Sequence, residues 1–219
     1  RYIRRQRQMC IRDRDKIGGL IFSIGTTKSH IDWLNKFQSL SKTPLLVSMD
    51  AEWGPSQRLS DVFAHPWNMT LGAIQDNSLV REISKRMAEQ NKALGIHYNF
   101  SPSVDVNNNS KNPIIGNRSF GEDPVNVYKK AKAYIQGHKD AGIFTSIKHF
   151  PGHGDTDKDS HKTLPVIKGD IKRLNSVELY PFKRLIEDGL AESVMLAHLS
   201  VPALDKKYPA SLSYKTVNN

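Results

Sequence analysis

The chain has 219 residues, of which 38% are hydrophobic, and it carries a formal net charge of +10. This length and composition suit one domain with a substantial core, or part of a larger one. No apolar run approaches the ~20 residues needed to cross a bilayer, and no secretory apolar segment is recognisable, so the sequence predicts no membrane-spanning helix.

Half of the excess positive charge lies at the start of the chain. RYIRRQRQMCIRDRDK (1–16) contains seven Lys or Arg residues and two Asp residues, a net charge of +5. Such an arm could bind RNA or phosphate. Because it has no helical or strand periodicity, we expect a non-native or disordered segment over 1–16, a domain over 17–219, and no nucleic acid partner. The only cysteine, Cys10, lies in this arm, so no disulfide framework is predicted.

The rest of the chain alternates between two kinds of segment. Short apolar runs rich in β-branched residues predict buried strands, and amphipathic runs between them predict helices. Gly95 and Gly142 are expected to end the second and third helices, and Pro181 to divide the fourth. In chain order we predict strand 17–25, helix 30–40, strand 44–50, helix 79–94, strand 97–106, helix 125–141, strand 143–150, helix 174–190 and strand 193–202.

This alternation predicts an α/β fold with parallel strands, either a doubly wound sheet or a barrel. Polar residues at or just past the predicted strand ends favour the barrel, where ligands gather at the carboxyl ends of several strands. These residues are Asp50, Asp105, Lys148, His149 and His198. Because a full barrel has eight strand–helix units and we count about five, we expect an incomplete TIM (β/α)8 barrel with a further helix starting near Ser213.

The stretch KHFPGHGDTDKDSHKTLP (148–165) concentrates histidine and aspartate. A zinc or iron site is one interpretation, but the spacings form no recognised ligand frame, so we expect no metal. Loop capping is a second, especially for His153 between two glycines. The third is acid–base chemistry, in which Asp159 holds His161 in one tautomer and raises its pKa.

Four ordered motifs resemble bacterial β-N-acetylhexosaminidases of glycoside hydrolase family 3. The first is the stretch 148–165 with its Asp-Ser-His loop. The others are MDAEWGPSQRL (49–59), NFSPSVDVNNNSKNPIIGNRSFGEDP (99–124), and VMLAHLSVPALD followed by YPASLS. Together they extend over nearly all of residues 17–219.

The resemblance implies roles for six residues. His161 is the general acid/base and Asp159 its orienting partner, which departs from the usual pair of carboxylates. Asp50, Arg118, Lys148 and His149 bind sugar hydroxyls. The structural alternatives are loop capping for Asp50, a loop anchor for Arg118 and a salt bridge at the barrel mouth for Lys148. For Asp105 and His198, structural support and ligand contact stay equally open.

One departure from the family pattern concerns the second strand end. Where many relatives read Glu-Gly-Gly-Arg-Val-Gln-Arg, this chain reads EWGPSQRL, with Trp53 and Pro55. Trp53 is either a stacking platform for a sugar face or part of the loop packing. The change affects what occupies the site beyond the terminal sugar.

The implied activity is that of a retaining exo-β-N-acetylglucosaminidase, which removes terminal GlcNAc from peptidoglycan fragments or related glycans without a metal or organic cofactor. The resemblance places the nucleophilic aspartate beyond Asn219, so we expect residues 1–219 alone to show no hydrolysis. A β-glucosidase specificity, a metal-dependent hydrolase and a non-catalytic sugar-binding module remain alternatives. A location in the bacterial cytoplasm and one outside the inner membrane are both left open.

Overall fold

The computed structural model of the chain describes residues 17–158 and 163–218. The basic segment 1–16 and the predicted acid/base pair, Asp159 and His161, therefore lie outside the described residues. Among the described residues, no helix is both long and apolar enough to cross a membrane.

The strands are parallel and follow one another in chain order, as the strand–helix alternation predicts. A four-stranded sheet has the order β1-β2-β3-β4, and β5 pairs with β6. An isolated bridge between Ser103 and Lys148 connects the segment after β3 to β5. The fold is thus a TIM barrel that is incomplete. The strands are β1 (Gly19–Phe22), β2 (Leu46–Met49), β3 (Tyr98–Asn99), β4 (Phe144–Thr145), β5 (Ile147–Phe150) and β6 (Val194–Leu196).

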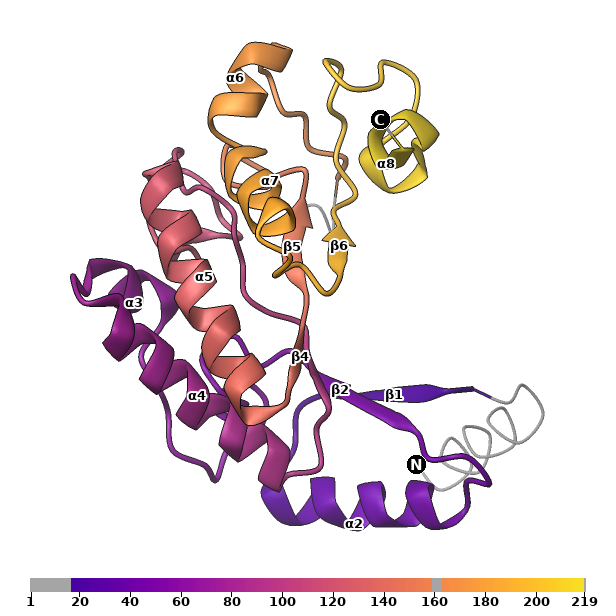
Figure 1. Cartoon of the computed structure of the whole chain (residues 1–219). Coiled ribbons are helices and arrows are strands. Elements are labelled where there is room, and N and C mark those ends of the chain that lie inside the picture. Colours follow the sequence, from indigo (N-terminus) through magenta and orange to yellow (C-terminus); the bar gives the residue numbers. More distant parts are fainter. Residues whose placement is uncertain (1–16, 159–162, 219) are drawn as a thin grey trace.

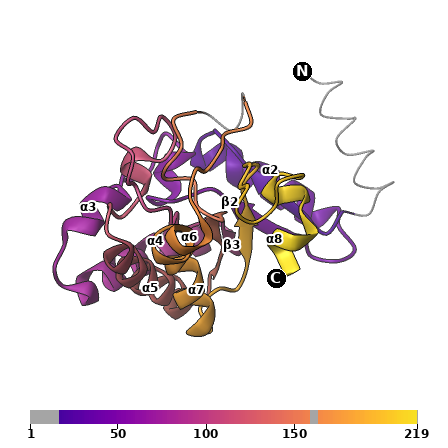
Figure 2. The same cartoon turned by 90° about the horizontal axis from the view of Figure 1, so that it is seen from above.

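The helices lie along the outside of the strands. In Figure 1, α4 and α5 run side by side to the left of β4, and α7 lies beside β5. The view from above also shows α4 beside α5 (Figure 2). The α-helices are α2 (Thr27–Ser39), α3 (Asn68–Ala73), α4 (Asn77–Ala93), α5 (Pro124–Ala141), α6 (Ile171–Ser176), α7 (Tyr180–Glu187) and α8 (Tyr214–Asn218). Short 3-10 turns are η1 (Pro55–Gln57), η2 (Gly116–Arg118) and η3 (Ala210–Leu212).

The helix ends follow from local sequence. Asp123 accepts hydrogen bonds from the first free N–H groups of α5, and Gly142 ends that helix with a left-handed φ of 77°. The predicted division of the fourth helix is confirmed, because Pro181 lies in the first turn of α7, where its missing N–H costs nothing. Helix α3 was not predicted, since six residues are too few to show helical periodicity.

The expectation that all five strand segments are buried is wrong for the first. Ile21 on β1 is 59% exposed. Its neighbour Phe22 packs against the core, so the side chain of Ile21 lies on the opposite face of the strand. The predicted strand 97–106 is also shorter, with only Tyr98 and Asn99 in the ladder. Predicted strand 143–150 divides into β4 and β5.

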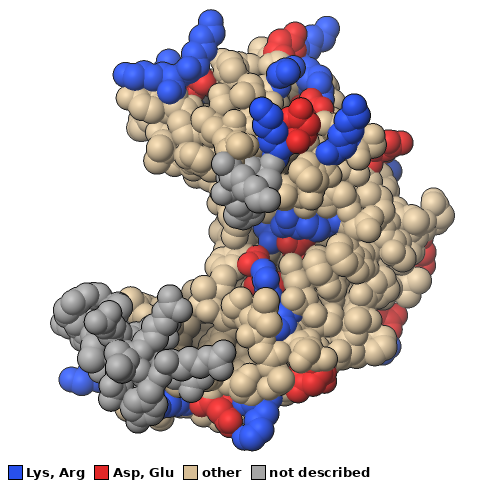
Figure 3. Space-filling view, turned by 180° about the vertical axis from the view of Figure 1, so that it is seen from behind, with Lys and Arg blue, Asp and Glu red and all other residues tan. Residues whose placement is uncertain are grey.

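The incomplete barrel leaves a deep hollow. Seen from behind, the molecule is C-shaped, and Lys, Arg, Asp and Glu side chains gather inside the hollow while its walls are mostly uncharged (Figure 3). Charged groups inside a concave surface are the usual mark of a ligand site.

Candidate active site

An alternating row of cations and carboxylates lies where β2 and β5 end. Asp50 directly follows β2, and its carboxylate accepts from Arg58 and from Lys148, each at 2.9 Å. The Lys148 ammonium also lies 2.8 Å from Glu52. The guanidinium of Arg118 completes the row, with Nη2 2.8 Å from the same Glu52 oxygen.

The charge on Glu52 is held by its neighbours. Burial alone would raise the pKa of this carboxyl group, but the positive charges of Lys148 and Arg118 lower it to about 2. The side chains of Lys148 and Glu52 are only 2% and 1% exposed. Both charges are therefore removed from water, and each stabilises the other. Glu52 therefore stays ionised near neutral pH and cannot act as a proton donor there.

A second buried carboxylate orients His149. Asp105 accepts from His149 Nδ1 at 2.7 Å, from the backbone N–H of His153 at 2.7 Å and from Ser103 at 2.8 Å. Burial opposes its charge, but His149 and these donors hold the pKa of Asp105 well below its usual range. Asp105 is thus a structural support, fully buried beneath the site.

The two partners of His149 define its tautomer. Its Nε2 atom lies 3.1 Å from Nη2 of Arg118. A guanidinium can only donate, so Nε2 accepts, and the ring proton lies on Nδ1, which donates to Asp105. The imidazole is therefore fixed in orientation between Asp105 and Arg118.

Buried side chains hold the Asp50–Glu52 backbone from behind. Asn99 donates to the carbonyl of Ala51 and accepts from its N–H, both at 3.0 Å. The Tyr134 hydroxyl on α5 donates to the carbonyl of Glu52 at 3.0 Å. These three hydrogen bonds set the direction in which the carboxylates of Asp50 and Glu52 leave the chain.

A further buried histidine supports Asn99. His138 Nε2 lies 2.9 Å from the Asn99 amide nitrogen, and Nδ1 lies 2.8 Å from the Ser84 hydroxyl. Ser84 in turn donates to the carbonyl of Tyr134 at 2.6 Å. Burial lowers the pKa of His138 to about 3, so its ring is neutral. Each donor in this series of hydrogen bonds, from Asn99 through His138 to Ser84, then has an acceptor.

The loop after β5 is shaped by close packing. A Cβ on Gly154 would lie 1.7 Å from the carbonyl oxygen of Val106, so only glycine fits. The Asn112 amide donates to the carbonyls of His153 and Gly154 at 2.7 and 3.0 Å. His153 is 1% exposed and bonds Thr156 at 2.7 Å. These contacts favour the structural interpretation of His153.

The structure brings together four predicted site residues: Asp50, Arg118, Lys148 and His149. Their arrangement also contains the salt bridge foreseen as the alternative for Lys148. His198 is exposed and its Nδ1 atom bonds Ser211 at 2.6 Å. The predicted catalytic pair, Asp159 and His161, lies outside the described residues.

Glu52 and Arg58 were missed as site residues by sequence reasoning. Both lie in the quoted motif at 49–59, and Glu52 is two residues from Asp50, the spacing that puts side chains on one side of an extended chain. Tyr134 and His138 gave no such signal. They are four residues apart on the buried face of α5, where such residues look like ordinary core positions.

Two other kinds of site differ from this cluster. Among residues 17–158 and 163–218, no group of three or more His, Cys, Asp or Glu side chains could hold a metal ion. A pocket of about 510 Å³ lies between α7 and the segment before α8, but its lining is mainly apolar and includes Phe150, Leu179, Phe182, Ile186 and Leu204. Its polar lining residues, Asn175, Lys183, Glu187, Lys215 and Thr216, include none of the predicted site residues.

The exposed tips of the cluster suit a polyhydroxylated ligand. Side chains of Asp50, Arg118 and His149 are 25%, 21% and 17% exposed. They present a carboxylate, a guanidinium and an imidazole ring beside one another. Hydrogen bonds to Arg58, Lys148, Glu52 and Asp105 hold these three groups in place. Such preset donors and acceptors match the adjacent hydroxyls of a sugar ring.

Comparison with known proteins agrees with this geometry. The chain is 34% identical to "Beta-hexosaminidase A" of Pseudoalteromonas piscicida, over 92% of this chain and 38% of that protein. It is 38% identical to "Beta-hexosaminidase LpqI" of Mycobacterium tuberculosis, over 80% of this chain and 45% of that protein. The chain thus spans less than half the length of these two relatives.

A solved structure is similar over the same region. A glycoside hydrolase family 3 β-N-acetylglucosaminidase from Paenibacillus sp. str. FPU-7 superimposes with a TM-score of 0.86 and 38% sequence identity, over 92% of this chain and 40% of that one. The glycosyl hydrolase family 3 N-terminal domain matches residues 3–219. With the incomplete barrel and the cluster at its strand ends, this match shows that the chain belongs to glycosyl hydrolase family 3.

Proposed function

We propose that the complete protein carrying this domain is a retaining exo-β-N-acetylglucosaminidase. The observation that carries the proposal is the preset cluster of Asp50, Glu52, Lys148, Arg118 and His149, whose partly exposed tips match the hydroxyls of one terminal sugar. The similarity to proteins named β-hexosaminidase supports GlcNAc as that sugar. The substrates are glycans with terminal GlcNAc, such as peptidoglycan fragments.

The proposed proton transfer uses the Asp159–His161 pair. His161 protonates the leaving oxygen as an aspartate attacks the anomeric carbon, and then takes a proton from the water that releases the sugar. Asp159 orients the imidazole and stabilises its charged form. A neutral imidazole beside the nucleophile avoids a second anion at that point.

The described carboxylates near the cluster are unsuited to the nucleophilic role. Asp50 is paired with Arg58 and Lys148, and Glu52 with Lys148 and Arg118. Asp105 is buried and accepts from His149, His153 and Ser103. A carboxylate held this way cannot approach an anomeric carbon, so we assign these groups to binding and support.

The proposal is tested with nitrophenyl N-acetylglucosaminide and nitrophenyl glucoside in parallel, using the complete protein. We expect a large preference for the N-acetylglucosaminide that survives exhaustive chelation. Preference for the glucoside would indicate a β-glucosidase, loss of activity on chelation a metal-dependent hydrolase, and GlcNAc binding without turnover a binding module.

A further inference from the structure

Glu178, in the turn between α6 and α7, is a buried carboxylate outside the sugar-binding cluster. Its side chain is 2% exposed, and its Oε1 atom accepts from Nη2 of Arg173 at 2.8 Å. The Asn108 amide lies 3.4 Å from the same oxygen. The Oε2 atom is buried and has no hydrogen-bond partner among the residues that the structure describes. Because buried polar atoms nearly always have partners, a carboxylate at this position calls for an explanation.

The side chain of Glu178 lies directly against the loop that follows β5. A Cβ on Gly152 would be 2.8 Å from the Cβ of Glu178, and Gly152 has a φ of 124°, so the chain needs glycine there. The N–H of Gly152 donates to the carbonyl of His149 at 2.8 Å. The backbone that leaves the sugar-binding cluster therefore packs on Glu178.

Arg173 extends this contact further along the loop. Its Nη2 atom lies 2.8 Å from Glu178 and 3.0 Å from Asp155, so one nitrogen joins two carboxylates. Burial raises the pKa of Glu178, and the positive charge of Arg173 opposes that rise. The arginine is placed by α6, because the N-cap residue Asp170 accepts from its backbone N–H at 2.7 Å.

The same loop is held from its other side by Asn112. The Asn112 amide donates to the carbonyls of His153 and Gly154, so the loop lies between this residue and the Glu178–Arg173 pair. Asp155 is only four residues before Asp159, a stretch of chain that spans at most about 14 Å. A general acid must lie within hydrogen-bond distance of the oxygen that it protonates, so a small displacement of this loop is costly.

We propose that Glu178 is a positioning residue for the acid/base loop, which it holds directly at Gly152 and indirectly through Arg173 and Asp155. This inference rests on the proposed function, since it assumes that His161 is the acid/base. An apolar side chain at 178 could fill the same space without burying a charge, so the carboxylate is explained by the arginine that it holds. Its loss should misplace the proton donor and leave the sugar-binding cluster intact.

The test compares phenyl and dinitrophenyl N-acetylglucosaminide as substrates of the complete protein. Phenolate is a poor leaving group that needs a proton from the general acid, whereas dinitrophenolate leaves without one. We expect Glu178→Ala to lower kcat/KM for the phenyl glycoside roughly tenfold, part of the 10²–10⁴-fold that general acid–base catalysis contributes. Because kcat/KM covers only the steps up to release of the leaving group, its value for the dinitrophenyl glycoside should stay within about twofold. The inhibition constant of GlcNAc should also be unchanged.

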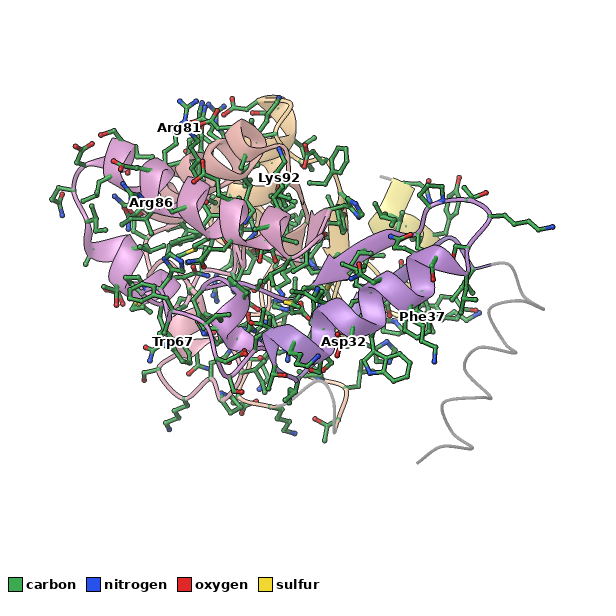
Figure 4. All side chains as sticks on the ribbon, turned by 90° about the horizontal axis from the view of Figure 1, so that it is seen from below. Asp32, Phe37, Trp67, Arg81, Arg86 and Lys92 are labelled. Carbon is green, nitrogen blue, oxygen red and sulfur yellow. The ribbon has the colours of Figure 1, made fainter. Side chains whose placement is uncertain are left out.

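Two further variants calibrate this result. Glu178→Gln keeps an oxygen that can accept from Arg173, so it should recover most of the activity on the phenyl glycoside. Asp140→Ala is the matched control, because it breaks a surface pair with Arg81 at 2.7 Å and should change neither substrate. Figure 4 shows Arg81 at the edge of the molecule.

Two outcomes would overturn the proposal. If Glu178→Ala lowers kcat/KM for both substrates by the same factor, Glu178 supports the fold alone. If neither value changes, the loop is held without it. Should Glu178→Ala fold poorly, Asp155→Ala removes the other end of the link, which is 24% exposed, and should give the same selective loss. Failure of the proposed function is separate, because the unaltered protein would then hydrolyse neither glycoside.

Discussion

The two parts of the candidate site are held in different ways. The backbone of Asp50–Glu52 is clamped by Asn99 and Tyr134, and its carboxylates are paired with buried or half-buried cations. The loop at 151–158, which leads to Asp159, depends partly on Arg173, a half-exposed side chain 3.0 Å from Asp155 and 2.8 Å from Glu178. Sugar binding and proton transfer should therefore respond separately to mutation, binding to changes in the core and proton transfer to changes in the loop.

The largest expected effect lies on the loop side. Asp159→Asn should lower turnover roughly 100-fold, because an amide cannot stabilise the imidazolium of His161 as a carboxylate does. The Michaelis constant should change little. The measurement is the pH profile of turnover, in which the pKa assigned to His161 should fall. An unmoved profile would show that Asp159 is not coupled to His161.

On the binding side, Glu52→Gln should destabilise the complete protein by about 3 kcal/mol, since Lys148 is left buried without its closest anion. Its control is Glu82→Gln, in a surface pair with Arg86, which should cost less than about 1 kcal/mol. Urea unfolding measures both. Equal small losses would mean that the buried pair contributes little.

The lowered pKa of Glu52 also predicts how the unfolding free energy depends on pH. The pKa of Glu52 is about 2 in the folded chain against an ordinary 4.5, so the unfolded chain takes up this proton first as the pH falls. The stabilisation is therefore complete above about pH 4.5 and lost between there and pH 2. The unfolding free energy of Glu52→Gln should lack this part of the acid dependence.

A smaller effect is expected for Arg118→Lys. Lysine keeps the charge opposite Glu52 but loses the fork that reaches both Glu52 and His149. We expect the Michaelis constant for the N-acetylglucosaminide to rise about tenfold, with a small change in melting temperature. Arg81→Lys, in a surface pair with Asp140, is the control. A lower melting temperature with an unchanged Michaelis constant would make Arg118 a structural anchor.

The smallest effect concerns the loop anchor. Arg173→Ala removes a side chain that is 38% exposed, but it leaves Glu178, which is 2% exposed, without its cation. Its cost in unfolding free energy should therefore be about 1–2 kcal/mol, below that of Glu52→Gln. Turnover should still fall a few-fold, because the loop that carries the acid/base pair loses an attachment. Arg184→Ala, in a surface pair with Glu187, is the matched control for both measurements. Equal turnover in the two variants would remove Arg173 from the positioning of the loop.

Local sequence signals predicted the architecture well. Apolar strand runs, amphipathic helices, and the positions of Gly142 and Pro181 led to parallel strand–helix units, and the structure confirms them. The same signals put Asp50, Lys148 and His149 at strand ends, and the family resemblance then gave them sugar-binding roles. Such signals are readable since each depends on neighbours within a few residues.

Only the tertiary structure decided how the site is held. Three features join residues 31 to 98 positions apart: the pairing of Lys148 with both Asp50 and Glu52, the tautomer of His149, and the hydrogen bonds from Ser84 through His138 to Asn99. The exposure of Ile21 likewise depends on which face of β1 is covered. Hydrogen bonds and burial depend on distance in space, and the linear sequence carries no local pattern for contacts between such remote segments.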